Sequence, residues 1–91
     1  MGWFSKLFSS TPAAPKRGET ETIEGYRVTP EPMPRDGQFQ TAGLIESGDG
    51  ETLQTHRFIR ADLHPTFEQA CSHSVQKAEQ IIREQGARLF S

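Results

Sequence analysis

A stretch near the C-terminal end limits most strongly what this chain can fold into. In residues 66–85, small and apolar side chains recur at three- and four-residue steps, the spacing of one face of an α-helix. They are Phe67, Ala70, Cys71, Ser74, Ala78, Ile81 and Ile82. Such a stripe cannot bury itself, and most helix stability in water comes from packing on another element. The upstream chain must therefore supply a surface that covers it.

The predicted helix has signals at both ends. Thr66 is followed three residues later by Gln69, the spacing of a capping box, in which the first side chain accepts a hydrogen bond from the later backbone N–H. Gly86 can adopt the left-handed backbone conformation that often closes a helix. We therefore predict Thr66 as the N-cap and a helix end near Gln85.

Three upstream stretches alternate in the manner of β-strands, at residues 22–29, 38–46 and 52–60. The proline-rich residues 30–34 are predicted to end the first strand, because proline has no N–H to donate to a sheet. Turn residues at 35–37 and 47–51 then connect the strands as antiparallel neighbours. Gly43, inside the second strand, indicates a bulge or a close approach of another group, for which the helix is the expected candidate.

This order of elements predicts an α+β fold of the βββα type. A three-stranded antiparallel β-meander is followed by one long C-terminal helix packed on one face of the sheet. A short amphipathic N-terminal segment precedes it. Which face of the third strand looks inward is left open.

The chain is small and has no strong overall charge. Its 91 residues are enough for one domain and leave little room for a deep active site. Ten basic and twelve acidic residues, a net charge of −2, give no general positive field for nucleic acid or anionic lipid. The single cysteine, Cys71, excludes an intramolecular disulfide and fits a cytoplasmic location. No apolar run reaches the roughly 18 residues that cross a bilayer, so membrane contact is expected to be peripheral at most.

The N-terminal residues 1–8 are a separate feature. One side of this segment, taken as a short helix, carries our candidate anchor, Trp3, Phe4, Leu7 and Phe8. Two alternatives stay open: the segment folds back onto the domain, or it enters a membrane interface or a partner's groove. Residues 9–20 have the composition of a flexible linker, which leaves a single domain at residues 21–91.

No catalytic, cofactor-binding or metal-binding pattern stands out. The soft and imidazole ligands of the chain are His56, His64, Cys71 and His73. Their spacings match no zinc site, and the serines and glycines form neither a nucleophile elbow nor a phosphate-binding loop. We therefore predict that the protein is not an enzyme and uses no cofactor or metal. Arg60 and Asp62 are predicted to form an ion pair at the turn from strand to helix.

The sheet face that the helix leaves open is the predicted binding surface. Arg27, Arg57 and Arg60 can be placed on it as a candidate DNA-binding surface. Acidic residues in or near the strands are Glu24, Glu46 and Glu51. Because their charges would repel phosphates, the residues alone favour protein interaction over direct DNA binding.

Several short motifs spread over the chain outside the linker point to a family. They are Met1-Gly2-Trp3-Phe4, Tyr26 with Pro30-Glu31-Pro32, Gln40-Thr41-Ala42-Gly43, residues 56–62 (HRFIRAD), and Ile81-Ile82 leading through Gln85-Gly86 to Leu89-Phe90. With these motifs the chain resembles the small bacterial HlyU family, named for transcriptional activation of a haemolysin gene and distinct from the winged-helix regulator of the same name. The resemblance implies a bacterial transcriptional regulator whose partner is DNA or a transcription-associated protein. It carries over no catalytic or base-reading residue.

A second class of function stays open beside the regulator. In it, the chain is a non-enzymatic protein-interaction or dimerisation module that forms a homodimer or holds a partner. A membrane-peripheral form of this module would use the aromatic N-terminal segment as its tether.

Overall fold

The computed structural model describes residues 17–90. Within this range the elements are β1 (Glu21–Ile23), β2 (Tyr26–Pro30), β3 (Met33–Arg35), β4 (Gln38–Ser47), η1 (Gly50–Thr52), β5 (Gln54–His64), α2 (Phe67–Gln85) and η2 (Gly86–Phe90). The candidate anchor and residues 9–16 of the predicted linker lie outside the described residues. Residues 17–20 are described and run beside β2, where the Gly18 N–H donates to the Pro30 carbonyl at 2.9 Å.

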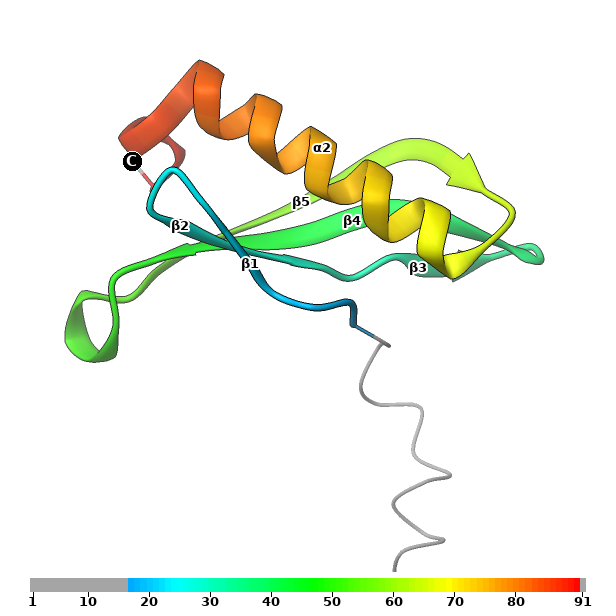
Figure 1. The fold of residues 1–91 in the computed structure, drawn as a ribbon, viewed down its shortest axis with the longest axis horizontal. Helices are drawn as coiled ribbons and strands as arrows, with labels where there is room; N and C mark the ends of the chain where they lie inside the picture. The colour runs from blue at the N-terminus through cyan, green and yellow to red at the C-terminus, as the bar shows by residue number, and fades with distance from the viewer. Residues whose placement is uncertain (1–16, 91) are drawn as a thin grey trace, which may run out of the picture.

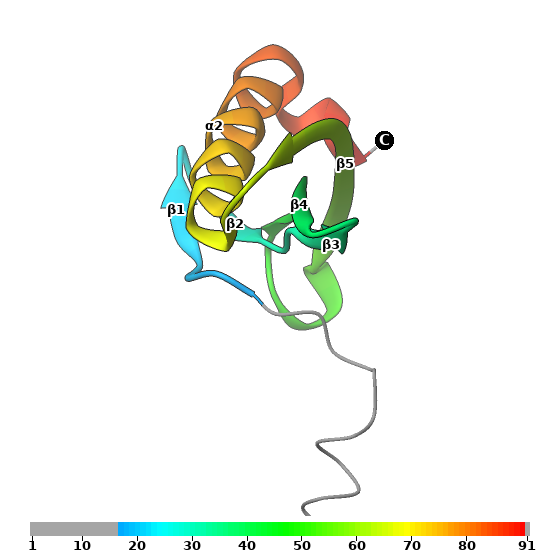
Figure 2. The ribbon, with the colours of Figure 1, turned by 90° about the vertical axis from the view of Figure 1, so that its right-hand side faces the viewer.

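β4 is the centre of an antiparallel sheet. It pairs with β5 along one edge, while β2 and β3 lie end to end along its other edge, and β1 pairs with the outer side of β2. Helix α2 lies across one face of this sheet (Figure 1). Viewed from the side, β5 curves upward beside the helix (Figure 2). The α+β class and the C-terminal helix are therefore as the sequence predicted.

The predicted three-stranded meander has to be corrected, because the sheet has five strands. The first predicted strand contains a hairpin turn: Glu24 and Gly25 have φ angles of 50° and 87°, and Ile23 lies opposite Tyr26. Positive φ at both central residues is the geometry of a type I′ hairpin. Residues 22–29 therefore form β1 and β2 and not one continuous strand.

The prolines of residues 30–34 interrupt the sheet without ending it. The Glu31 N–H donates to the Ala42 carbonyl at 2.9 Å, between Pro30 and Pro32. Pairing with β4 then resumes at Met33, opposite Gln40. Because only the non-proline residue needs to donate here, the chain continues along β4 as β3.

The second predicted strand is confirmed by β4, whereas the third is displaced. The chain forms η1 at Gly50–Thr52, and β5 runs from Gln54 to His64 instead of over residues 52–60. Its register shifts between Ile59, opposite Ala42, and Leu63, opposite Gln40. Residues 60–62 of β5 thus face Thr41 alone, which is a bulge of the kind that sequence periodicity does not reveal.

Helix α2 has the predicted ends. The Thr66 hydroxyl accepts a hydrogen bond from the Gln69 backbone N–H at 3.1 Å, and Gly86 closes the helix with a φ of 53°. Of the predicted stripe, the buried members are Ala70, Ser74, Ala78, Ile81 and Ile82. The amphipathic pattern therefore identified the face that packs on the sheet.

The core lies between α2 and the sheet. Its buried members are Val28, Ile45, Phe58, Ala78, Ile81, Ile82 and Leu89. Gly43 lies opposite Phe58, and a Cβ on Gly43 would come within 2.7 Å of the Phe58 ring. The group that covers Gly43 is thus a side chain of the neighbouring strand, and the expectation that the helix covers it was wrong.

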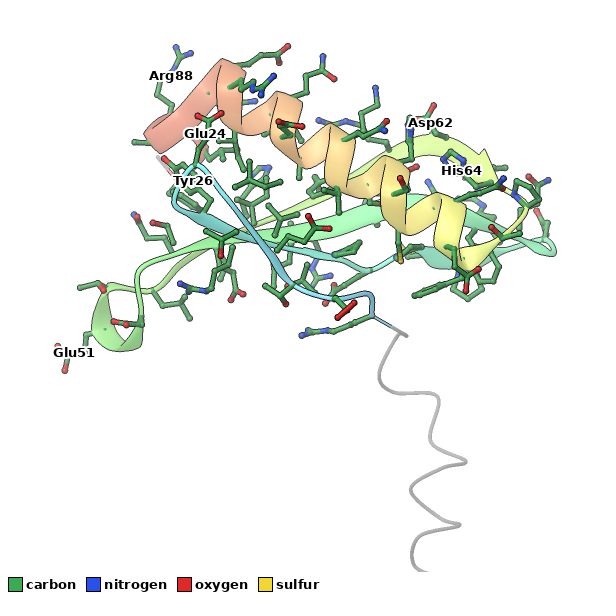
Figure 3. All side chains as sticks on the ribbon, in the orientation of Figure 1. Glu24, Tyr26, Glu51, Asp62, His64 and Arg88 are labelled. Atoms are coloured by element: carbon green, nitrogen blue, oxygen red, sulfur yellow. The ribbon has the colours of Figure 1, made fainter. Side chains whose placement is uncertain are left out.

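The C-terminal end of α2 is held against the β1–β2 hairpin. Tyr26 stacks on Phe90 of η2 with ring centroids 6.1 Å apart, and Arg83 pairs with Glu24 at 3.3 Å. Figure 3 shows Glu24 and Tyr26 beneath this end of the helix. The aromatic contact closes this end of the core, while the exposed ion pair contributes little.

Ser74 connects the helix to the irregular part of the sheet. Its hydroxyl donates to the Ala70 carbonyl at 2.7 Å and accepts from the Ala42 backbone N–H at 3.2 Å. Ser74 and Ala42 are both buried. The hydroxyl therefore satisfies a backbone donor at the point where the β4–β5 register shifts.

We expect Ser74→Ala to lower the free energy of unfolding by about 1–3 kcal/mol, because the buried Ala42 N–H loses its acceptor. Urea denaturation followed by circular dichroism measures this change. The exposed Ser72→Ala, on the same helix, is the matched control and should stay within about 0.5 kcal/mol of the parent. Equal effects of the two substitutions would show that the Ser74 hydroxyl is not needed at the bulge.

Candidate functional site

Alternation along the strands gives the sheet two faces. Val28, Ile45 and Phe58 belong to the core beneath α2. Their strand neighbours Arg27 and Arg57 therefore point away from the helix. We call this second surface the helix-free face, and two of the three predicted surface arginines share it.

The guanidinium groups of the candidate arginines have partners within the protein. Arg27 lies opposite Glu46 and donates to the Gly48 carbonyl at 2.5 Å. Arg60 lies in the register-shifted part of β5 and donates to the Ile59 carbonyl at 3.4 Å. Because alternation does not define a face inside a bulge, the register does not bring Arg60 together with the other two.

Arg57 forms part of an ionic cluster around a buried carboxylate. Its Nη1 donates to Oε1 of Glu31 at 2.5 Å, and Arg17 Nε lies 2.5 Å from Oε2 of the same carboxylate. The Glu31 side chain is 1% exposed, while those of Arg17 and Arg57 are 57% and 54% exposed. The contact with Arg17 is an ion pair without hydrogen-bond geometry. The two cations neutralise a carboxylate that burial alone would disfavour.

Glu31 was missed in the sequence, where it lies between two prolines in a stretch predicted to leave the sheet. No local signal marks its burial. The closest local indication is the pair of flanking prolines. A residue before a proline is held extended, and Glu31, unlike Pro30 and Pro32, keeps an N–H that can pair with β4. Its two arginine partners are distant in sequence, so only the folded sheet brings the three together.

Half-exposed apolar side chains lie on the same face. Phe39 packs edge-on against Phe67 of α2, so its neighbour Gln40 points to the helix-free face. Met33 and Leu63 are the register partners of Gln40 on the two sides of β4. Ile59 lies in the adjoining row, opposite Ala42.

We name Met33, Ile59 and Leu63 the sheet patch. Their relative exposures are 41%, 49% and 43%. Gln40 is held between them, since its Oε1 accepts from Arg35 at 3.1 Å and its Nε2 donates to the Arg60 carbonyl at 2.8 Å. The patch is therefore an apolar surface with a fixed polar centre and arginines around it.

A second polar cluster lies where β5 leads into α2. Asp62 pairs with His73 at 3.3 Å, so the predicted ion pair between Arg60 and Asp62 was wrong. The His73 ring lies 4.7 Å from the His64 ring, and His64 contacts the buried Thr41 hydroxyl at 3.2 Å. Figure 3 shows Asp62 and His64 at this end of β5. An open depression of about 480 Å³ lies beside these histidines.

A shallow groove of about 330 Å³ lies between residues 19–21 and α2. Its lining residues are Glu19, Glu21, Pro30, Cys71, Ser72, Val75 and Gln76. In the part of the chain that the structure describes, no group of three or more His, Cys, Asp and Glu side chains is placed to hold a metal ion. No helix within residues 17–90 is long and apolar enough to cross a membrane.

Comparison with known protein families assigns the chain to one of them. The family model described as "Transcriptional activator HlyU" matches residues 2–90. The chain belongs to the HlyU family. No curated protein and no solved structure matches it.

Membership of the HlyU family makes the chain a member of a group described as transcriptional activators. This description confirms the regulator that the resemblance implied and names no enzymatic activity. It connects the chain with DNA or with the transcription machinery as the general class of partner. The candidate surface of Arg27, Arg57 and Arg60 remains a prediction, and the sheet patch is the surface that sequence reasoning did not find.

Proposed function

We propose that this protein regulates transcription by binding a protein of the transcription machinery through the sheet patch, and not by reading DNA. The half exposure of Met33, Ile59 and Leu63 on one sheet face is the observation that carries this proposal. Protein interfaces combine an apolar centre with a polar rim. A surface that binds DNA instead offers unpaired cations to phosphates.

The charges on the helix-free face support the same conclusion. Arg57 and Arg17 are neutralised in part by Glu31, and Arg27 lies opposite Glu46. The negative charges of the buried Glu31 and of Glu46 would weaken the attraction of the arginines for a phosphate backbone that approaches this face. The arrangement fits better a partner that presents apolar side chains flanked by a few carboxylates, because each half-exposed guanidinium group can still donate to one such carboxylate.

The helix content of residues 17–90 also favours a protein partner. The single α-helix in this range buries one face on the sheet, and no second helix accompanies it there to form a helix-turn-helix unit. DNA reading by this part of the chain would have to use the strands. The helix-free face of those strands carries the sheet patch in place of a continuous row of basic side chains.

We expect the intact protein to bind labelled double-stranded DNA only weakly and to lose this binding as salt rises toward the physiological range. Non-specific phosphate contacts have this strong salt dependence. Fluorescence anisotropy at low and near-physiological salt measures it. Tight, salt-resistant and sequence-selective binding would contradict the proposal and favour direct DNA regulation.

The same proposal predicts which variants lose regulation. In a strain lacking the gene, transcripts that depend on the protein should be restored by the parent and by Leu53→Glu, but not by Ile59→Glu or Leu63→Glu. Leu53 is the matched control because it is 45% exposed yet precedes β5, at the opposite end of this strand from Leu63. A charge buried in the centre of an interface typically weakens binding about tenfold or more. Full restoration by Ile59→Glu would show that the sheet patch is not the regulatory surface.

A further inference from the structure

The sheet patch lies close to the point where the described chain begins. The Thr20 hydroxyl bonds to that of Thr29 at 2.7 Å, and the Gly18 N–H donates to the Pro30 carbonyl. This strand-like segment is antiparallel to β2, so toward lower residue numbers the chain runs in the direction of β3 and Met33. Arg17, next along it, contacts Glu31 on the helix-free face.

From this geometry we propose that residues 1–8 of the same chain fold back onto the sheet patch. The apolar side of the segment, which carries Trp3 and Phe4, then covers Met33, Ile59 and Leu63. In this arrangement the N-terminal segment occupies the regulatory surface until the partner displaces it. The regulatory part of this inference rests on the proposed function, whereas the docking itself does not.

The connecting chain is long enough for this contact. Residues 9–16 span at most roughly 26 Å when extended, at about 3.3 Å per residue. Glu31, beside the start of the described chain, and Ile59 lie on the two sides of Ala42. Two strand spacings separate them, or about 10 Å. A connection of this length gives a tethered segment an effective concentration on the order of millimolar.

The chemistry of the two surfaces also matches. The segment 1–8 has apolar side chains on one side, whereas Lys6 is expected on the other. Docking through the apolar side therefore keeps Lys6 away from Arg35 and Arg57 at the edges of the patch. The sheet patch, in turn, consists of three large apolar side chains. The rest of residues 17–90 leaves each of them about 40–50% exposed.

The groove between residues 19–21 and α2 is another surface near the start of the described chain. Two carboxylates, Glu19 and Glu21, line this groove. An indole or phenyl ring entering it would have to displace water from these carboxylates without replacing their hydrogen bonds, which is unfavourable. The sheet patch has no carboxylate among its three members and is therefore the preferred position.

The single tryptophan of the chain, Trp3, allows a direct test with the full-length protein. In the parent, we expect a blue-shifted Trp3 emission and protection from acrylamide quenching. Ile59→Glu and Leu63→Glu should each shift the emission to the red and increase the quenching, because a lost apolar contact of this size lowers the docking equilibrium about tenfold or more. Leu53→Glu, with an equally exposed leucine outside the sheet patch, should leave Trp3 unchanged. Circular dichroism checks that each variant stays folded.

Four results would overturn the inference. A fully quenchable Trp3 in the parent would show that the segment is not docked. A response to Ser72→Lys but not to Ile59→Glu would place it beside α2, in the groove or in the depression next to His64 and His73, because Ser72 lines both. Emission that moves to the red on dilution would indicate docking onto a second copy, and protection that requires phosphatidylglycerol vesicles would indicate a membrane tether.

The test is independent of the regulatory partner. If Trp3 responds to Ile59→Glu while transcript levels do not, the docking stands and the proposed function fails. If transcript levels respond while Trp3 is exposed in the parent, the proposed function stands and the docking fails. If both the docking and the proposed function hold, deletion of residues 1–8 should leave the sheet patch open, and the transcripts that depend on the protein should rise at low protein levels. Unchanged transcript levels would show that the docked segment does not compete with the partner.

Discussion

Replacement of Phe58 by alanine is expected to lower the free energy of unfolding by about 3–5 kcal/mol. The Phe58 side chain is 2% exposed and belongs to the cluster of Val28, Ile45 and the helix residues above them. Its removal leaves a cavity in the middle of a thin core that has few other large side chains to fill it. Because a small domain has a total stability of only about 5–15 kcal/mol, a large part of the variant should be unfolded in moderate urea, as followed by circular dichroism.

The neighbouring Ile59→Ala is the matched control. Ile59 follows Phe58 on the same strand but lies on the helix-free face and is 49% exposed. Its loss should cost under about 1 kcal/mol, since a half-exposed side chain gives up little buried area. Similar unfolding midpoints for the two variants would contradict the position of Phe58 in the core.

A double substitution tests the contact between Phe58 and Gly43. In the parent, a Cβ on Gly43 would lie 2.7 Å from the Phe58 ring and 3.1 Å from the Thr29 carbonyl oxygen. Gly43→Ala should therefore be markedly destabilising alone and much less so when Phe58 is already alanine. Residues in contact commonly show such non-additivity, of about 0.5–3 kcal/mol. Additive effects would show that another group limits the space at Gly43.

The second large effect is expected for Arg57→Glu. This change replaces the hydrogen-bonded partner of the buried Glu31 by a second carboxylate. Removing one partner of a buried pair costs about 3–5 kcal/mol. Since Arg17 remains beside Glu31 and residue 57 is half exposed, we expect a loss of about 2–4 kcal/mol in the free energy of unfolding. Thermal and urea unfolding both measure it.

Two further variants separate this effect from a general effect of charge. Arg60→Glu, on the same strand, makes the same change at an exposed residue that has no carboxylate partner among the described residues, and it should cost under about 1 kcal/mol. Glu31→Gln should restore part of the stability of Arg57→Glu by removing the repulsion. If Glu31→Gln brings no recovery, the Glu31 carboxylate is not the cause. Arg60→Glu is consequently the cleaner variant for testing DNA contact.

The elements predicted correctly are those with strong local signals. Helix α2 combines a cap at Thr66, an apolar stripe and a terminating Gly86, and each of these depends only on residues within a few turns. Strand β4 alternates regularly, and the turn at residues 36–37 has an Asp-Gly pair whose positive φ angles match a tight hairpin. These features needed no knowledge of the rest of the fold.

The strands predicted incorrectly are those in which the fold overrides the local pattern. Glu24 adopts a φ of 50°, which glutamate rarely does, and the sequence alternation continues through it without interruption. The proline-rich stretch pairs with β4 because Glu31 has the one N–H that the sheet needs there. The bulge at residues 60–62 follows from the pairing with β4 and is not encoded by residues of β5 alone.

The candidate site, too, was predicted from the sequence only in part. Alternation along the strands left the face of Arg57 open, and only the burial of Val28 and Phe58 beneath the helix placed Arg27 and Arg57 on a common face. The family motifs were enough to indicate a transcriptional activator family. The buried Glu31 and the sheet patch were not found, because neither is a property of one segment. Each depends on residues from different strands that become neighbours only in the sheet.

The sequence by itself determined the helix, its two ends, the central strand and the family, because these rest on periodicity, capping residues and motifs that are read along the chain. Only the tertiary structure decided the five-strand order, the burial of Glu31 between Arg17 and Arg57, and the half exposure of Met33, Ile59 and Leu63. The physical reason is that burial and charge pairing depend on which strands are adjacent and in which register. In an antiparallel sheet, that choice joins residues that lie far apart in the sequence.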